Sequence, residues 1–209
     1  MSDGFDPQRL MRFVLEMRQA GITDAKALSA LERTPRDHYA PAAMSQLAYD
    51  DSGLPLPHGQ TMTKPSIVGR VIAALDVQPG DNILEIGTGS GFQAAALATM
   101  ARRVTTLDLW LDLVTDARAR FGTARIMNVS AHLADGAGGY GEHAPYDRIV
   151  LNVGVETIPE TLAVQLVSGG VIVAPVGDQN TQRLVRIRNG LRDDLGPIKF
   201  SMIEKGVEA

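Results

Sequence analysis

Three glycines alternate with other residues directly after an apolar segment, in the sequence ILEIGTGSG at 83–91. Glycine at every second position allows a sharp backbone turn that can lie against a ligand where a Cβ atom would collide. Glu85 places a carboxylate two residues before the first of these glycines, and the helix expected over 91–101 points its N-terminus at the same place. The pattern predicts a binding site for a nucleotide-like cofactor.

The spacing of the glycines separates two classes of cofactor. A dinucleotide-binding turn reads G-x-G-x-x-G and holds a pyrophosphate at the helix N-terminus. Here the spacing is G-x-G-x-G, with Phe92 where the third glycine of that pattern would fall. A carboxylate such as Glu85 is a poor neighbour for a pyrophosphate but a good one for a cation. S-adenosyl-L-methionine carries a sulfonium and an ammonium group and no phosphate, so the turn favours it over a nicotinamide cofactor.

Two further acidic residues follow expected strands. Asp108 ends the second of these strands, where a carboxylate can accept hydrogen bonds from both ribose hydroxyls. Asp135 follows the third and can contact the adenine amine. Taken singly, a glycine triplet can be a plain tight turn, and an acid can be a solvated strand end or a helix cap. Together they predict a cofactor site formed by Glu85, Ile86, Gly87, Thr88, Gly89, Gly91, Asp108, Leu109, Asp135 and Gly136.

Alternating strands and helices must position these residues. Runs rich in β-branched and apolar residues predict strands at 82–86, 104–108, 148–152 and 171–175, with a weaker one near 126–133. Helical periodicity predicts helices near 91–101, 110–120 and 159–167. Such alternation is typical of a parallel sheet covered on both faces. Strand character at 183–188 and 198–204 predicts an antiparallel pair at the end of the sheet.

The N-terminal part has a different pattern. Asp6 is a suitable cap for a helix that starts at Pro7 and ends near Gly21, and Thr23 can cap a second helix that ends before Pro35. A loop-like segment follows, and a third helix starts near residue 64. We expect one domain over 1–209, with a helical, substrate-side region at 1–78 and a cofactor-binding core at 79–209.

Composition excludes several classes of protein. The chain has 209 residues, 44% of them hydrophobic, a net charge of −4 and no cysteine. Its charge gives no general affinity for nucleic acid, and the lack of cysteine excludes disulfides, thiolate metal sites and cysteine nucleophiles. The four histidines lack metal-ligand spacing, so we expect no metal. Without a leader pattern or an apolar run of ~18 residues, the sequence predicts a cytoplasmic protein that does not enter membranes.

Five segments resemble the protein-L-isoaspartate O-methyltransferase family. They are residues 34–41, 48–51, 54–65, 84–93 and 144–147, and GQTMTKP at 59–65 is the most distinctive part. The resemblance implies an α/β, Rossmann-like class I methyltransferase fold, with a doubly wound, mostly parallel seven-stranded sheet and an N-terminal helical extension. It also implies protein repair. A methyl group passes from S-adenosylmethionine to the free α-carboxylate of isoaspartyl residues in damaged proteins, and the ester then closes to a succinimide that can reopen to aspartate.

The resemblance also implies site residues. Thr63 matches the family's active-site serine and keeps its hydroxyl, although a helix cap is another interpretation of this residue. Residues implied to contact the substrate are Pro57, His58, Gln60, Thr61, Asn152, Val153 and Gly154. The C-terminal strand around 200–203 can also bind a peptide or can be simple edge packing.

The sequence departs from the family at 152–157. NVGVET replaces a loop of small residues, so two valines and a glutamate are expected to change the shape and charge of the acceptor site. Two alternatives therefore stay open: a diverged methyltransferase acting on another carboxylate or a small molecule, and a protein that binds the cofactor without turnover.

The chemistry implied by the resemblance requires no general base. A carboxylate acceptor with a pKa near ~4 is already ionised at neutral pH. We therefore expect catalysis to come from alignment of the reactants, which can supply ~7–11 kcal/mol, and from a dry, apolar pocket.

Overall fold

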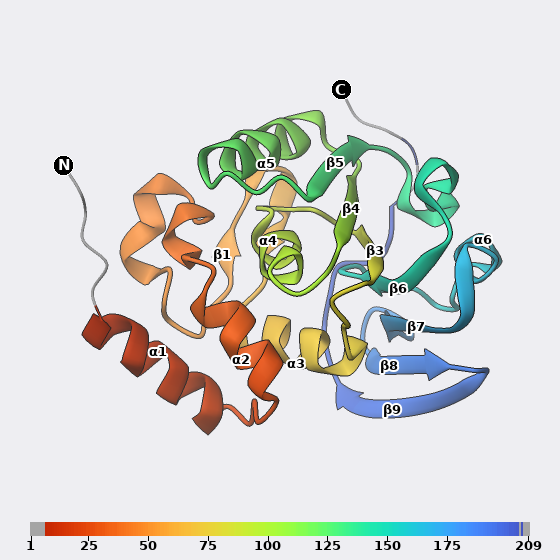
Figure 1. Ribbon diagram of the computed structural model, residues 1–209, viewed down its shortest axis with the longest axis horizontal. Coiled ribbons are helices and arrows are strands. Elements are labelled where there is room, and N and C mark those ends of the chain that lie inside the picture. The colour runs from red at the N-terminus through yellow and green to blue at the C-terminus, as the bar shows by residue number, and fades with distance from the viewer. Residues whose placement is uncertain (1–6, 205, 207–209) are drawn as a thin grey trace.

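A seven-stranded sheet forms the centre of the computed structural model, which describes residues 7–204 and 206 (Figure 1). The sheet has the order β5-β4-β3-β6-β7-β8-β9; strands β5 to β7 pair in parallel, and β8 and β9 are antiparallel. Its strands are β3 (Asn82–Ile86), β4 (Arg103–Asp108), β5 (Val129–Leu133), β6 (Tyr146–Leu151), β7 (Leu166–Val176), β8 (Arg183–Arg188) and β9 (Leu191–Pro197). The expected α/β fold with a mostly parallel seven-stranded sheet is confirmed.

Six α-helices accompany the sheet in the described part of the chain. They are α1 (Pro7–Gln19), α2 (Ala25–Glu32), α3 (Pro65–Leu75), α4 (Phe92–Ala98), α5 (Leu111–Thr123) and α6 (Glu160–Ala163). Figure 1 shows α1 to α5 on one side of the sheet and the short α6 on the other. Short 3-10 turns lie at 36–38, 42–47, 57–59, 136–138 and 141–143. Two short strands, β1 (Leu54–Pro55) and β2 (Thr61–Met62), pair antiparallel across the loop at 56–60.

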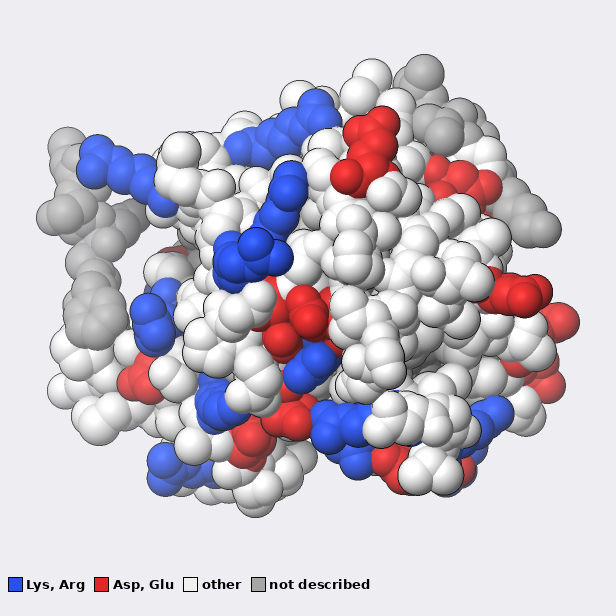
Figure 2. Space-filling model, turned by 45° about the vertical axis from the view of Figure 1, so that its right-hand side comes forward, with Lys and Arg blue, Asp and Glu red and all other residues white. Residues whose placement is uncertain are grey.

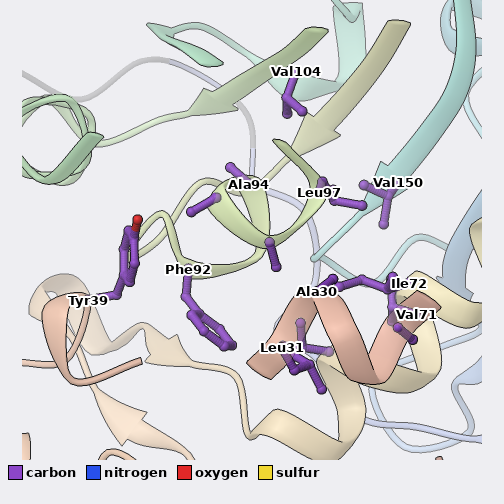
Figure 3. Packing of buried hydrophobic residues seen from close by; sticks show 14 of the residues in the cluster. Ala30, Leu31, Tyr39, Val71, Ile72, Phe92, Ala94, Leu97, Val104 and Val150 are labelled. Atoms are coloured by element: carbon purple, nitrogen blue, oxygen red, sulfur yellow. The ribbon is translucent and has the colours of Figure 1, made fainter. Parts of the chain in front are cut away.

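Two hydrophobic clusters lie on opposite faces of the sheet. Strand residues alternate between them, as in β7, where Val171 and Val173 belong to one cluster and Ile172 to the other. The larger cluster joins the N-terminal helices to α4 and α5. Figure 3 shows this packing with Ala30, Leu31, Tyr39, Val71, Ile72, Phe92, Ala94, Leu97, Val104 and Val150 labelled.

Two elements differ from the sequence prediction. The helix expected over 159–167 is wrong beyond residue 163, because the O of Gln165 accepts a hydrogen bond from Tyr146 N and the chain joins the sheet from Leu166. The strand expected over 198–204 is also wrong. The last strand in the described part of the chain is β9, and the described residues after it form no strand, although Met202 makes an isolated β-bridge with Gly154.

Cross-strand ion pairs accompany the antiparallel pairing of the polar β9 segment with β8. Arg183 Nε lies 2.6 Å from Asp194 Oδ2, and Arg186 NH2 lies 2.7 Å from Asp193 Oδ2. Opposite charges facing each other across antiparallel strands stabilise the pairing. Basic and acidic side chains also lie next to one another over the face shown in Figure 2.

The cap of α2 differs from the expectation. Asp24, not Thr23, caps α2, since its carboxylate accepts a hydrogen bond from Ala27 N at 2.7 Å. The predicted cap at Asp6 lies outside the described residues. Within residues 7–204 and 206, no helix is long and apolar enough to cross a membrane, and no three His, Asp or Glu side chains are grouped to hold a metal ion.

Candidate functional site

A cavity of about 570 Å³ lies at the carboxyl ends of β3, β4 and β6. The strand order reverses between β3 and β6, which is where open α/β sheets bind ligands. Of the residues that the sequence analysis selected, those lining it are Gln60, Thr61, Thr63, Ile86, Gly87, Thr88, Gly89, Asp108, Leu109, Gly136, Asn152 and Val153. Those outside its lining are Pro57, His58, Glu85, Gly91, Asp135 and Gly154.

The glycine turn needs its glycines for different reasons. Gly87, Gly89 and Gly91 all have positive φ, at 93°, 50° and 85°. A Cβ at Gly91 would lie 2.9 Å from the Phe121 ring, so this glycine allows α4 to pack against α5 rather than facing the cavity. The amides of Gly87 and Thr88 both donate to the O of Leu107, which ties the turn to β4.

Asp108 closes the turn from the neighbouring strand. Its Oδ2 accepts a hydrogen bond from Gly89 N at 2.8 Å, and its Oδ1 accepts one from Trp110 N at 3.3 Å. Burial raises the pKa of the Asp108 carboxyl, while these backbone donors oppose the rise. The carboxylate lines the cavity beside the turn, where it can accept hydrogen bonds from the hydroxyls of a ligand.

Glu85 lies beneath the turn and is completely buried. It accepts hydrogen bonds from Thr106 Oγ1 at 2.6 Å and from Asn152 Nδ2 at 3.1 Å. Burial raises the pKa of the Glu85 carboxyl to about 7, although these donors lower it in part. Glu85 is absent from the cavity lining, so its contacts are with residues that support the turn and not with the cavity itself.

Asn152 joins this buried carboxylate to the helix and the turn. Its Oδ1 accepts a hydrogen bond from Gln93 Nε2 at 2.9 Å, and its Nδ2 donates to Glu85 and to the O of Gly87. Thr106 extends the network to the Thr88 hydroxyl at 2.8 Å. The sequence analysis missed Gln93 and Thr106. Two threonines within an otherwise apolar strand were the available signal, because buried hydroxyls require partners.

Buried Arg36 holds the segment that contains Thr63. Its guanidinium donates to the backbone O atoms of Ala48, Ser52 and Thr63, and burial lowers its pKa to about 10. Thr63 lines the cavity and its hydroxyl makes no hydrogen bond with another described residue. The alternative role of Thr63 as a helix cap is wrong. Asp51 caps α3 instead, accepting hydrogen bonds from the N and Oγ of Ser66 at 2.8 and 2.7 Å.

The 152–157 loop brings less change to the cavity than its sequence suggests. Only Val153 of the two valines and the glutamate lines the cavity. Val155 is 2% exposed and packs into the smaller hydrophobic cluster, and Glu156 points to solvent. The charge of Glu156 therefore does not enter the lining, and the altered shape comes from Val153.

The C-terminal segment forms the opposite wall of the cavity. Gly154 N donates to the O of Ser201 at 2.7 Å, and Ile203 N donates to the O of Gly154 at 2.8 Å. Gln182 fixes the same segment, since its Nε2 donates to the O of Phe200 and its Oε1 accepts from Phe200 N. Three charged lining residues that the sequence analysis did not select are Lys64, Lys199 and Glu204.

Comparison with known proteins agrees with this geometry. The family model described as "Protein-L-isoaspartate(D-aspartate) O-methyltransferase (PCMT)" matches residues 8–198. Proteins named protein-L-isoaspartate O-methyltransferase are 42% identical in Paracoccus denitrificans (strain Pd 1222), over 99% of both chains, and 43% identical in Maricaulis maris (strain MCS10), over 96% of both.

Solved structures support the fold. One protein-L-isoaspartate O-methyltransferase has a TM-score of 0.83 at 21% identity, covering 94% of this chain and 66% of that one. A putative enzyme of this kind from Plasmodium falciparum, solved with S-adenosyl-L-homocysteine, has a TM-score of 0.79 at 21% identity, covering 92% and 97%. The chain described here belongs to the protein-L-isoaspartate(D-aspartate) O-methyltransferase family.

Proposed function

We propose that this protein transfers a methyl group from S-adenosyl-L-methionine to the free carboxylate of isoaspartyl residues in damaged proteins. The observation that carries the proposal is the composition of one cavity. The glycine turn and Asp108 line one part of it, and Thr63 and the C-terminal segment line another. Relatives of the same length that carry this enzyme's name support the same activity.

The residues around the turn fit this cofactor. Among the lining residues at 86–90 and 107–110, the charged side chain is that of Asp108. A carboxylate there suits the ribose hydroxyls of a nucleoside-containing cofactor. Buried Glu85 lies below the turn with its pKa raised to about 7, and a cationic ligand above it would favour the ionised form of this carboxyl. When bound, S-adenosylmethionine supplies a methyl group on a positively charged sulfur, which an oxygen nucleophile can displace.

The chain's own residues then act by position. Thr63 Oγ1 donates a hydrogen bond to one oxygen of the acceptor carboxylate and directs the other oxygen toward the methyl donor. The acceptor, with a pKa near ~4, is ionised at neutral pH, so no side chain needs to remove a proton. Arg36 keeps Thr63 in place, because its guanidinium donates a hydrogen bond to the backbone O of Thr63 at 3.0 Å. Holding the two reactants in line can supply ~7–11 kcal/mol of the barrier.

Other lining residues exclude water and hold the peptide. Met62, Phe92, Leu113 and Phe200 give the cavity apolar walls, which strengthen electrostatic interactions inside it. We assign contact with the peptide to Gln60, Thr61, Val153 and the segment that Gln182 holds. The hydrophobic cluster that includes both Phe13 and Leu184 supports one domain over 1–209. We further propose a cytoplasmic enzyme that needs no metal, membrane or nucleic acid.

A paired-peptide assay tests the function. The protein is incubated with methyl-labelled S-adenosylmethionine and two peptides that differ only in an isoaspartyl or an aspartyl linkage. Base-labile label on the isoaspartyl peptide alone is the expected result. Equal labelling of both peptides, or label only on a different carboxylate, would favour a diverged acceptor. Binding of the cofactor without S-adenosylhomocysteine formation would favour a protein without turnover.

A further inference from the structure

A histidine outside the cavity is stacked on a residue that lines it. The ring of His58 lies parallel to the indole of Trp110, with ring centroids 3.9 Å apart and an interplanar angle of 4°. His58 Nε2 also lies 2.7 Å from Asp112 Oδ2. Trp110 lines the cavity beside Asp108, whereas His58 and Asp112 do not. His58 therefore contacts the cavity only through another side chain.

The backbone at His58 is held in an uncommon conformation. Its φ is 59°, in the left-handed region, and neighbouring Gly59 has a φ of 68°. A residue with a Cβ stays in this region only where its surroundings hold it there. The stack on Trp110 and the contact with Asp112 are the interactions that hold the His58 side chain, and both partners belong to the start of α5.

This contact joins the two sides of the cavity. The segment that carries His58 continues into Gln60, Thr61 and Thr63, which line the acceptor side, while Trp110 follows the Asp108 carboxylate on the cofactor side. We propose that His58 is a positioning residue that holds Trp110 against the cofactor end of the cavity and so couples cofactor binding to the placement of Thr63. The inference rests on the proposed cofactor site.

The chain carries a reporter for this contact. It has one tryptophan, so its tryptophan fluorescence comes from Trp110 alone. An imidazole ring in contact with an indole quenches the indole emission. We therefore expect His58→Asn to raise the emission of the ligand-free protein. Asparagine tolerates the left-handed conformation, so this substitution removes the ring without adding backbone strain.

The test is titration of each variant with S-adenosylhomocysteine, followed by Trp110 emission and by calorimetry. Loss of an aromatic stack and of the hydrogen bond between His58 and Asp112 predicts a rise of roughly tenfold in Kd for His58→Asn. His58→Phe keeps a stacked ring but loses the contact with Asp112, so it should restore part of the affinity. Asp116→Asn is the matched control on α5, because Asp116 pairs only weakly with Arg120 at 3.9 Å, and it should leave Kd unchanged.

Each outcome decides a different point. Equal Kd and equal emission in wild type and His58→Asn would overturn the positioning role and leave the proposed function intact. Wild type that fails to bind S-adenosylhomocysteine would overturn both. His58→Asn with the melting temperature of wild type but a higher Kd, together with a lower Kd in His58→Phe, would show that His58 positions Trp110 rather than stabilising the fold. If His58→Asn did not fold, Asp112→Asn would take its place, with a smaller expected rise in Kd.

Discussion

Substitution of Glu85 by glutamine should change how the stability of this protein depends on pH. Burial raises the pKa of the folded-state carboxyl to about 7, from an ordinary value of 4.5. A group whose folded pKa is raised stabilises the fold fully below the unfolded pKa, and this contribution is lost as the pH rises through the folded pKa. The contribution of Glu85 to stability therefore decreases from pH 4.5 to pH 7.

The size of the effect follows from the two pKa values. Because each pH unit between them corresponds to 1.36 kcal/mol, complete ionisation of buried Glu85 costs about 3 kcal/mol of unfolding free energy. Glutamine has no such dependence. Relative to wild type, the Glu85→Gln variant should thus gain about 2–3 kcal/mol between pH 5 and pH 8.

The hydrogen-bond network can accept the glutamine. Its Oε1 can accept from Asn152 Nδ2, as the carboxylate does, and its Nε2 can donate to Thr106 Oγ1. The Thr106 hydroxyl is then free to donate to Thr88 Oγ1, 2.8 Å away. No buried polar atom loses its partner, so the change in charge is isolated from loss of hydrogen bonds.

Urea unfolding at pH 5, 6, 7 and 8 measures the prediction. The quantity of interest is the unfolding free energy of the variant minus that of wild type at each pH, which cancels the titration of all other groups. Glu156→Gln, on an exposed side chain, is the matched control. A difference that stayed constant over this range would refute the reasoning, because it would mean that Glu85 ionises in the fold as it does in water.

Three further substitutions test other parts of the site. Thr63→Val should lower kcat/KM for isoaspartyl peptide by about 10- to 100-fold with little change in melting temperature, since one hydrogen bond to a charged group is lost. Thr63→Ser, the control, should keep the activity. Retained activity in the valine variant would exclude the proposed role of the Thr63 hydroxyl. Gly91→Ala should destabilise the fold by about 2 kcal/mol, because a Cβ would lie 2.9 Å from the Phe121 ring at a φ of 85°; a melting temperature equal to wild type would contradict this. Arg36→Met should lower the free energy of unfolding in urea by about 3 kcal/mol or more, because it leaves three backbone O atoms without their donor. An unchanged urea midpoint would show that these hydrogen bonds do not contribute to stability.

Strands that a local sequence pattern encodes could be predicted from the sequence. The strands at 82–86 and 104–108 could be found because apolar runs end there in glycine or acid, and the structure has β3 and β4 at those places. The β9 strand could not be found, since its polar residues form a strand by pairing with β8, where Arg183 and Arg186 also make ion pairs with its aspartates. Pairing between distant segments leaves no local periodicity.

The same limit applies to the site. The sequence analysis selected the turn and Asp108 correctly as neighbours of one another, because a βα turn and the end of the next strand are adjacent in any such sheet. It could not place Glu85 beneath the turn, since that depends on Thr106 and Asn152 converging from two other strands. Nor could it find Asp51, which caps α3 from a loop 15 residues away in sequence.

The ion pairs along β9 have a consequence for an enzyme of this kind. β9 is the outer strand of the sheet, and its free edge is the natural place for another extended chain to add. Damaged proteins are partly unfolded, so an enzyme that binds them meets extended chains as a matter of course. The adjacent Asp193 and Asp194 of β9, paired with Arg186 and Arg183 of β8, place charge along that edge, and charge on an edge strand disfavours the addition of an apolar segment. We expect these charges to disfavour co-aggregation of the enzyme with extended segments of its substrates.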